Sequence, residues 1–152
     1  MPRVAHPLEA YISRESLLER PHNIATAIDP INPLEVDDAI RTTPVNKSGT
    51  EQHVQVFIAD AGLLLGHTAL IDEARAIGWS RYHETRPSKS KPMLPKHVYK
   101  DALGLDAKVG EGAPAIEIAF DLNLINGAII NIGVGKARVQ LESMSYTEHD
   151  RL

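Results

Sequence analysis

The sequence predicts an α+β domain with a mixed, mainly antiparallel sheet and flanking helices. Three observations support this fold class: alternating apolar and polar residues near both ends of the chain, helical spacing in the middle, and turn-forming residues between the alternating runs. A chain of 152 residues, 43% of them hydrophobic, is also the size of one ordinary domain with its own core. We therefore expect a single domain.

In chain order, the first expected elements are a helix, a strand and a hairpin. Residues 8–20 have apolar side chains at helical spacing, and Pro21 ends this helix. The run "NIATAI" predicts a strand that leads into Asp29. The runs "VDDAIRTT" and "HVQVFIAD" alternate and are joined by "PVNKSG", where Asn46 and Gly49 suit a turn. They predict an antiparallel hairpin.

The remaining elements are two helices and a second hairpin. Residues 68–77 have helical spacing, with Thr68 as a candidate N-cap and Gly78 as a stop. The run "RYHETRPSKSKPMLP" predicts a loop, and "KHVYKDAL" after it predicts a short helix. The run "AIEIAFDLNLINGAIINIGV" alternates on both sides of Asn126-Gly127, the preferred pair for a two-residue type I′ turn. It predicts an antiparallel hairpin.

Charge is distributed unevenly along the chain, although the net charge is only −4. The first forty residues hold seven acids against three arginines, whereas residues 81–100 hold one acid and six basic residues. We call these six the basic segment: Arg81, Arg86, Lys89, Lys91, Lys96 and Lys100. This polarity suits a protein that holds cations at one place and a polyanion at another, but a solvated basic loop explains the charge equally well.

The chain has no cysteine, which excludes disulfides and thiolate metal sites and agrees with a reducing compartment. Its N-terminal sequence has no apolar run of the length of a signal peptide, and no later segment is apolar enough to span a membrane. We therefore expect a soluble, cytoplasmic protein.

The run "AIDPINPLEVDDAI" concentrates four carboxylates, which we call the acidic loop: Asp29, Glu35, Asp37 and Asp38. Adjacent residues of a regular strand face opposite ways, so Asp37 and Asp38 can approach one point only across a bend, which the prolines favour. Crowded carboxylates repel each other unless they are protonated or share a cation, for which Mg²⁺ or Mn²⁺ is suited. Alternatively, Asp29 caps a turn, Glu35 is solvated and one aspartate lies on the surface.

Four runs occur in the order and approximate spacing of one enzyme family: "AIDPINPLEVDDAI", "VQVFIADAG", "ALIDEARAIGWSRY" and "KPMLPKHVYKDAL". From about Ile24 onward the chain resembles the ribonuclease II / ribonuclease R family, whose catalytic portion is the RNB domain. The resemblance covers only the N-terminal half of that domain. It divides the chain into a lead segment, 1–22, and a partial RNB-like catalytic domain, 23–152.

The resemblance implies hydrolysis of single-stranded RNA from its 3′ end with Mg²⁺ at the active site. By matched position, the active-site and metal-binding acids would be Asp29, Glu35, Asp37 and Asp38, with Glu35 standing where the family usually has aspartate. Tyr82 matches the tyrosine that packs against a base near the 3′ terminus. The RNA phosphates would be followed by residues that include Arg81, Arg86, Lys89 and Lys91.

Two functions remain open from the sequence. The first is a Mg²⁺-dependent exoribonuclease unit, active alone or when a second copy or another polypeptide completes the domain. The second is a non-catalytic RNA-binding or assembly protein that retains the same scaffold. In either case, the single tryptophan, Trp79, is expected to pack at the end of the central helix rather than to bind a base.

Overall fold

The computed structural model describes residues 23–29, 33–83, 86, 89–106 and 112–145. The expected helix over 8–20 and the lead segment 1–22 lie outside these residues. In chain order the elements are β1 (Asn23–Asp29), β2 (Asp38–Pro44), β3 (Glu51–Ala59), the 3₁₀ helix η1 (Ala61–Gly66), α2 (Thr68–Ile77), α3 (Lys96–Val98), the π-helical η3 (Tyr99–Leu103), β4 (Ala113–Asn123) and β5 (Ile129–Ser145).

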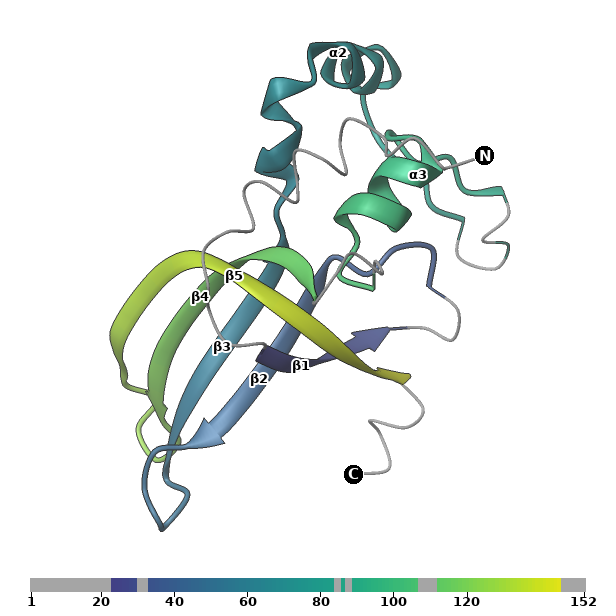
Figure 1. The fold of residues 1–152 in the computed structure, drawn as a ribbon. Helices are drawn as coiled ribbons and strands as arrows, with labels where there is room; N and C mark the ends of the chain where they lie inside the picture. The colour runs from purple at the N-terminus through teal and green to yellow at the C-terminus, as the bar shows by residue number, and fades with distance from the viewer. Residues whose placement is uncertain (1–22, 30–32, 84–85, 87–88, 107–111, 146–152) are drawn as a thin grey trace, which may run out of the picture.

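The five strands close into a barrel in the order β1-β2-β3-β4-β5, with β5 returning to β1 (Figure 1). Neighbouring strands are antiparallel except for β1 and β5, which run parallel. This arrangement confirms the expected mixed, mainly antiparallel sheet with helices beside it. Figure 1 shows α2 and α3 at one end of the barrel and the turns of both hairpins at the other.

The barrel interior is narrow and is filled mainly by small side chains, because the strands of a small barrel leave little space between them. Its buried cluster consists of Ala25, Ala27, Val36, Ala39, Phe57, Leu105, Ala113, Ala115, Ala137 and Val139. Phe57 is its largest member and has no exposed surface. A second cluster lies under the helices and consists of Leu63, Leu64, Val98, Ala102 and Leu103. The chain therefore has a barrel core and a helical cap core.

The helix α2 has the bounds that the sequence predicts, and Gly78 ends it with a φ of 84° while its N–H donates to Ala74 O at 2.8 Å. The prediction of Thr68 as the N-cap is wrong, because His67 occupies that position and makes no side-chain capping bond. The prediction that Trp79 packs at the end of this helix is also wrong, because the residue is 65% exposed. No residue of α2 is buried, so its end offers Trp79 no core.

No helix in the described residues has the length and apolarity to cross a bilayer.

The β4–β5 hairpin is confirmed, but its turn is longer than the expected two-residue type I′. A type I′ turn needs a positive φ at both central residues, and only Gly127 (φ 73°) has one, not Asn126. The side chain of Asn123 explains the difference, because its Oδ1 accepts the backbone N–H groups of Ile125 and Asn126 at 3.0 and 3.2 Å. Asn123 thus starts an Asx-type turn ahead of the Asn-Gly pair.

The outer face of the sheet carries a row of apolar side chains that crosses four strands. Ile40 pairs with Val56, Val56 with Ile118, and Ile118 with Val134. Ile40 is 39% exposed and Val134 is 71% exposed. We call these four residues the outer apolar row. A contiguous apolar surface of this kind is typical of a face that contacts another polypeptide.

The barrel core generates a stability prediction. Phe57→Ala should lower the free energy of unfolding by about 3–5 kcal/mol, because it removes the largest side chain of a closed interior. Urea unfolding monitored by circular dichroism measures the change. Ile132→Ala removes a side chain that is 68% exposed and should change the same quantity by less than about 0.5 kcal/mol. Equal losses in the two variants would contradict the assignment of Phe57 to the core.

Candidate active site

The acidic loop is bent where it enters β2. Val36 and Ala39 are buried, at 2% and 4% exposure, while Asp37 and Asp38 between them are both exposed. In a regular strand every second residue shares a face, so two buried residues separated by two exposed ones require a break in the alternation. The break is the bend that the sequence requires if both carboxylates are to lie on one side of the chain.

Backbone contacts hold this loop against the barrel and the cap. Val36 O accepts the N–H of Leu105, and Asp37 O accepts the N–H of Ala59, both at 2.8 Å. Lys100 Nζ lies 3.4 Å from Pro33 O. The loop is therefore fixed by the end of β3 on one side and by the segment after η3 on the other. This places it at the helical end of the barrel (Figure 1).

The carboxylates are close enough to affect one another's ionisation. Although Asp37 reaches solvent, the surrounding protein desolvates its carboxyl group and raises its pKa to about 6, and the negative charges of Glu35, Asp38, Asp29 and Asp106 add to this shift. The pKa of Asp29 is also raised, by burial first and then by Asp38 and Asp106. The acids that the sequence singles out thus share one region of negative potential, together with a fifth acid.

Sequence reasoning missed the fifth acid, Asp106. It follows η3 and lies far along the chain from the acidic loop, so spacing gave no signal for it. Lys100 Nζ lies 3.2 Å from Asp106 Oδ2, while Asp106 Oδ1 is buried without a hydrogen-bond partner. Lys100 therefore bridges Asp106 and Pro33 O. Lys100 is therefore bonded to the segment that carries the acidic loop, whereas the other residues of the basic segment are exposed to solvent.

The donor chemistry of the loop fits a hard divalent cation, because carboxylate oxygens are the ligands that Mg²⁺ and Mn²⁺ prefer. In the described part of the chain, however, no three acidic or histidine side chains surround one point as they stand. An ion would therefore require some of these side chains to change rotamer. After desolvation, the negative charges of Glu35, Asp38 and Asp29 add to the raised pKa of Asp37, and a cation held here would offset this part of the shift.

Tyr82 lies beside the acidic loop. Its hydroxyl donates a hydrogen bond to Glu35 Oε1, and this bond, followed by burial, raises the pKa of Tyr82 to about 12. The residue is nevertheless 62% exposed, so much of its ring faces solvent. The structure thus brings Tyr82 to Glu35 from 47 residues away. The hydroxyl is anchored while the ring remains open to a ligand.

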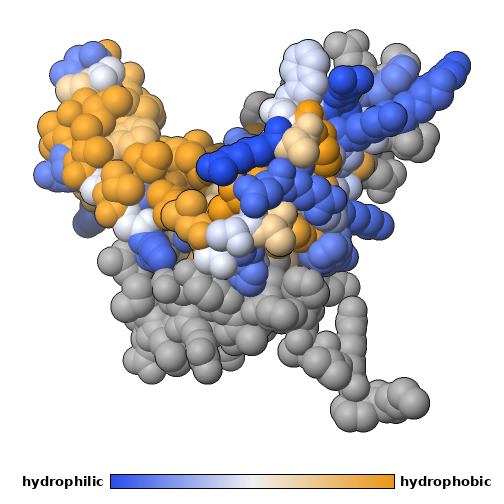
Figure 2. Space-filling view, turned by 90° about the horizontal axis from the view of Figure 1, so that it is seen from above, coloured by the Kyte–Doolittle hydropathy of each residue, from blue (hydrophilic) through white to orange (hydrophobic). Residues whose placement is uncertain are grey.

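The loop that carries the basic segment folds back on itself. Arg81 and Lys91 exchange backbone hydrogen bonds of 2.9 and 2.8 Å, and Ser80 Oγ accepts the N–H of Met93 at 2.9 Å. Arg81, Arg86, Lys89 and Lys91 are all exposed. Figure 2 shows the helical end of the molecule with hydrophilic side chains gathered on one side and hydrophobic ones on the other.

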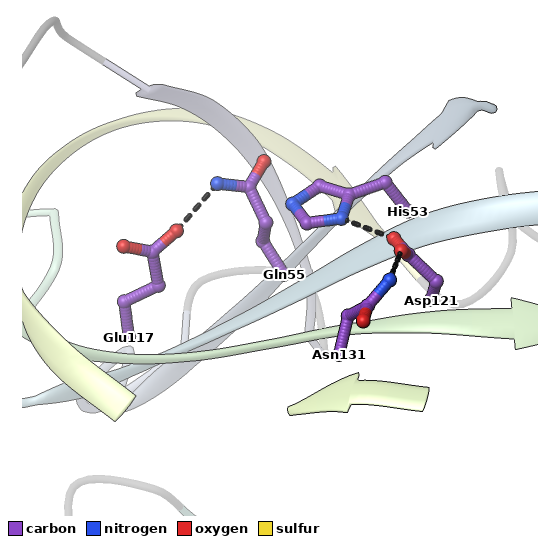
Figure 3. Close-up of polar contacts among 5 residues, drawn as sticks. All are labelled: His53, Gln55, Glu117, Asp121 and Asn131. Carbon is purple, nitrogen blue, oxygen red and sulfur yellow. Dashed lines mark hydrogen bonds and ion pairs between the residues drawn. The ribbon is translucent and has the colours of Figure 1, made fainter. Parts of the chain in front are cut away.

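Two groups of polar contacts lie along β3 and β4, one around Asp121 at the end away from the acidic loop and one between Gln55 and Glu117 closer to that loop (Figure 3). His53 Nδ1 lies 2.7 Å from Asp121 Oδ1, and Asn131 Nδ2 donates to Asp121 Oδ2 at 2.7 Å. Gln55 Nε2 donates to Glu117 Oε1 at 2.5 Å. The bonds from Asn131 and His53 lower the pKa of Asp121. The contacts around Asp121 tie β3, β4 and β5 together, the Gln55–Glu117 bond joins β3 to β4, and neither group was anticipated from the sequence.

The fold is similar to parts of several solved structures. No family model matches the chain, and no curated protein matches its sequence. Mycoplasma genitalium RNase R in complex with double-stranded RNA superposes with a TM-score of 0.77 at 16% identity, over 98% of this chain and 25% of that one. The Dss1 exoribonuclease active-site mutant from Candida glabrata gives 0.69 at 17% identity, over 87% and 19%. Yeast Ssd1, a pseudonuclease, gives 0.70 at 17% identity, over 90% and 17%.

These similarities show that the chain has the fold of part of an RNase R-type exoribonuclease, which confirms the resemblance at the level of the fold. The chain spans about a quarter of the length of RNase R and less than a quarter of the lengths of the other two proteins. Because the same fold occurs in exoribonucleases and in a pseudonuclease, it does not by itself decide whether RNA is cut. That question depends on the site.

The electrostatics of the loop predict how stability depends on pH. Folding raises the pKa of Asp37 from 3.8 to about 6, so ionisation is disfavoured in the folded protein. The wild-type protein should therefore lose stability as the pH rises from about 4 to above about 6. Asp37→Asn cannot ionise, so it should be more stable than wild type near pH 7 and nearly equal near pH 4.

Urea unfolding without divalent ions, across this pH range, measures the difference between the two proteins. Asp72→Asn is a matched control, because it removes an exposed carboxyl of α2 that lies outside the acidic loop. A difference between Asp37→Asn and wild type that stays constant with pH would contradict the crowding of the carboxylates.

Proposed function

We propose that this chain is the acid-bearing part of a Mg²⁺-dependent exoribonuclease that degrades single-stranded RNA from its 3′ end in the cytoplasm. The observation that carries the proposal is the bent acidic loop with Tyr82 bonded to Glu35. RNase R, whose fold the chain shares, is known in complexes with double-stranded RNA and with ribose-methylated single-stranded RNA. The absence of cysteine suits the reducing cytoplasm.

The residues proposed to hold the ion are Asp29, Glu35, Asp37 and Asp38. When bound, the ion supplies a lowered pKa for the attacking water and neutralises the charge that develops on the scissile phosphate. The protein's own task is to hold the backbone that carries these carboxylates, and the buried Val36 and the backbone bonds to Leu105 and Ala59 support this role. Without a cation, these carboxylates would repel the scissile phosphate itself, whereas the base and phosphate contacts outside the acidic loop do not depend on the ion.

The RNA would reach the loop past Tyr82 and the exposed part of the basic segment. Tyr82 presents an open ring, and stacking on an aromatic ring holds a base without reading its identity. The phosphates would contact Arg81, Arg86, Lys89 and Lys91, so binding should weaken with salt. These contacts provide sequence-independent binding, as a degradative enzyme requires.

A second candidate function is RNA binding or assembly without cleavage. Ssd1 shows that a pseudonuclease can have this fold, and Glu35 carries one more methylene than the aspartate that the family resemblance predicts at this position. The outer apolar row supports a related proposal, that a second copy or another polypeptide covers this face and completes the domain. Cleavage could then require the completed assembly.

Cleavage distinguishes the two candidate functions. The wild-type chain should shorten a 5′-labelled single-stranded oligoribonucleotide from its 3′ end in Mg²⁺, and not in EDTA. Asp37→Asn and Asp38→Asn should each reduce the rate at least about 100-fold, because small changes in a site of this kind are costly. Asp101→Asn, outside the acidic loop, is the control. Binding without shortening in Mg²⁺ or Mn²⁺ would favour the non-catalytic function.

Tyr82 allows the base contact to be separated from the fold. Tyr82→Ala should weaken binding of single-stranded RNA roughly 5- to 100-fold, because it removes a stacking surface. Tyr82→Phe loses the bond to Glu35 and keeps the ring, so it should retain most of the affinity. Fluorescence anisotropy with a labelled oligoribonucleotide measures both. An unchanged dissociation constant in Tyr82→Ala would remove this tyrosine from the binding site.

A further inference from the structure

The single tryptophan, Trp79, is exposed to solvent without a core to contact. It is 65% exposed and directly follows Gly78, which ends α2. Tryptophan is normally largely buried, because its ring contributes more apolar area than any other side chain. An exposed tryptophan on a folded segment is therefore a candidate contact for a ligand.

The guanidinium of Arg81 lies over the ring of Trp79, 5.5 Å from its centroid. Such a cation–π contact orients both side chains in the free protein. A ligand that binds here therefore loses less affinity to the ordering of these side chains. Because the guanidinium occupies one face of the ring, the exposed surface that remains includes an aromatic area open to a second planar group. The pair presents a flat ring beside a positive charge.

The position of this pair relative to Tyr82 indicates which ligand it suits. Trp79 and Tyr82 are three residues apart, so their Cα atoms lie within about 11 Å. Both residues are exposed, at 65% and 62%. Arg81 lies between them in the chain, and its backbone is hydrogen-bonded to the backbone of the exposed Lys91. Two exposed aromatic residues on one short segment that also carries Arg81 suit a single strand of nucleic acid, in which bases and phosphates alternate.

We propose that Trp79 and Arg81 form a second base-binding platform, which stacks a nucleobase of single-stranded RNA upstream of the base at Tyr82. Arg81 supports the ring of Trp79 and faces the intervening phosphate. The inference rests on the proposed RNA-binding function and extends it by a site that neither the sequence motifs nor the metal chemistry requires. It predicts that the chain binds at least two bases next to the acidic loop.

Intrinsic fluorescence tests this directly, because the chain contains one tryptophan. Titration of the full chain in EDTA with a single-stranded oligoadenylate should quench the emission of Trp79 as binding proceeds. An abasic oligomer with the same ribose-phosphate backbone should leave the emission unchanged. Quenching by the abasic oligomer equal to that by oligoadenylate would overturn base stacking at Trp79.

Variants give an independent measurement by anisotropy with a labelled oligoadenylate. Trp79→Ala should weaken binding roughly 5- to 100-fold, whereas Trp79→Phe should retain most of the affinity because an aromatic ring remains. Leu65→Ala, which truncates a hydrophobic side chain that is 76% exposed on η1, should bind as wild type does. Trp79 is exposed, so circular dichroism should show all three variants folded.

The outcomes separate this inference from the proposed function. The second platform is wrong, and RNA binding stands, if Trp79→Ala binds oligoadenylate as well as wild type does and the tryptophan emission of wild type does not change on binding. If wild type binds no RNA at all, the proposed function fails and the platform fails with it.

Discussion

The site depends on the repulsion between carboxylates that the fold forces together. Val36 and Ala39 must both enter the barrel core, and this leaves Asp37 and Asp38 exposed side by side at the start of β2. Hydrophobic burial of Val36 and Ala39 thus fixes the backbone that carries these two carboxylates. The pKa of Asp37 is raised to about 6 first because the surrounding protein desolvates its carboxyl group and then because Glu35, Asp38 and the other nearby acids are negatively charged.

The rest of the structure serves to hold that arrangement and to bring other residues to it. The barrel fixes β2 and β3, and the helical cap returns the chain so that Leu105 and Lys100 bond to the backbone at Val36 and Pro33. Asp106, which is paired with Lys100, adds negative charge near Asp37. The loop between α2 and α3 carries Tyr82 to Glu35. The acids, the aromatic ring and the exposed cations therefore meet at the helical end of the barrel, while the polar network around Asp121 braces the other end.

Local patterns predicted much of this from the sequence, and long-range contacts account for what they missed. Alternation and helical spacing gave the strands, both hairpins and the bounds of α2 because these signals are periodic and local. Closure of the barrel by the parallel β1–β5 pair depends on residues more than a hundred positions apart, and no local signal reports it. Asp106 and the exposure of Trp79 were missed for the same reason, since both depend on which elements pack nearby.

The most direct measurement is the titration of the Asp37 carboxyl group by carbon-detected NMR in the absence and presence of Mg²⁺. Without divalent ions, the crowded loop should give Asp37 a pKa of about 6. Saturating Mg²⁺ should lower this value, because a cation held by the loop favours the ionised carboxylates. A pKa close to the ordinary 3.8 that Mg²⁺ does not change would contradict both the crowding and the metal site.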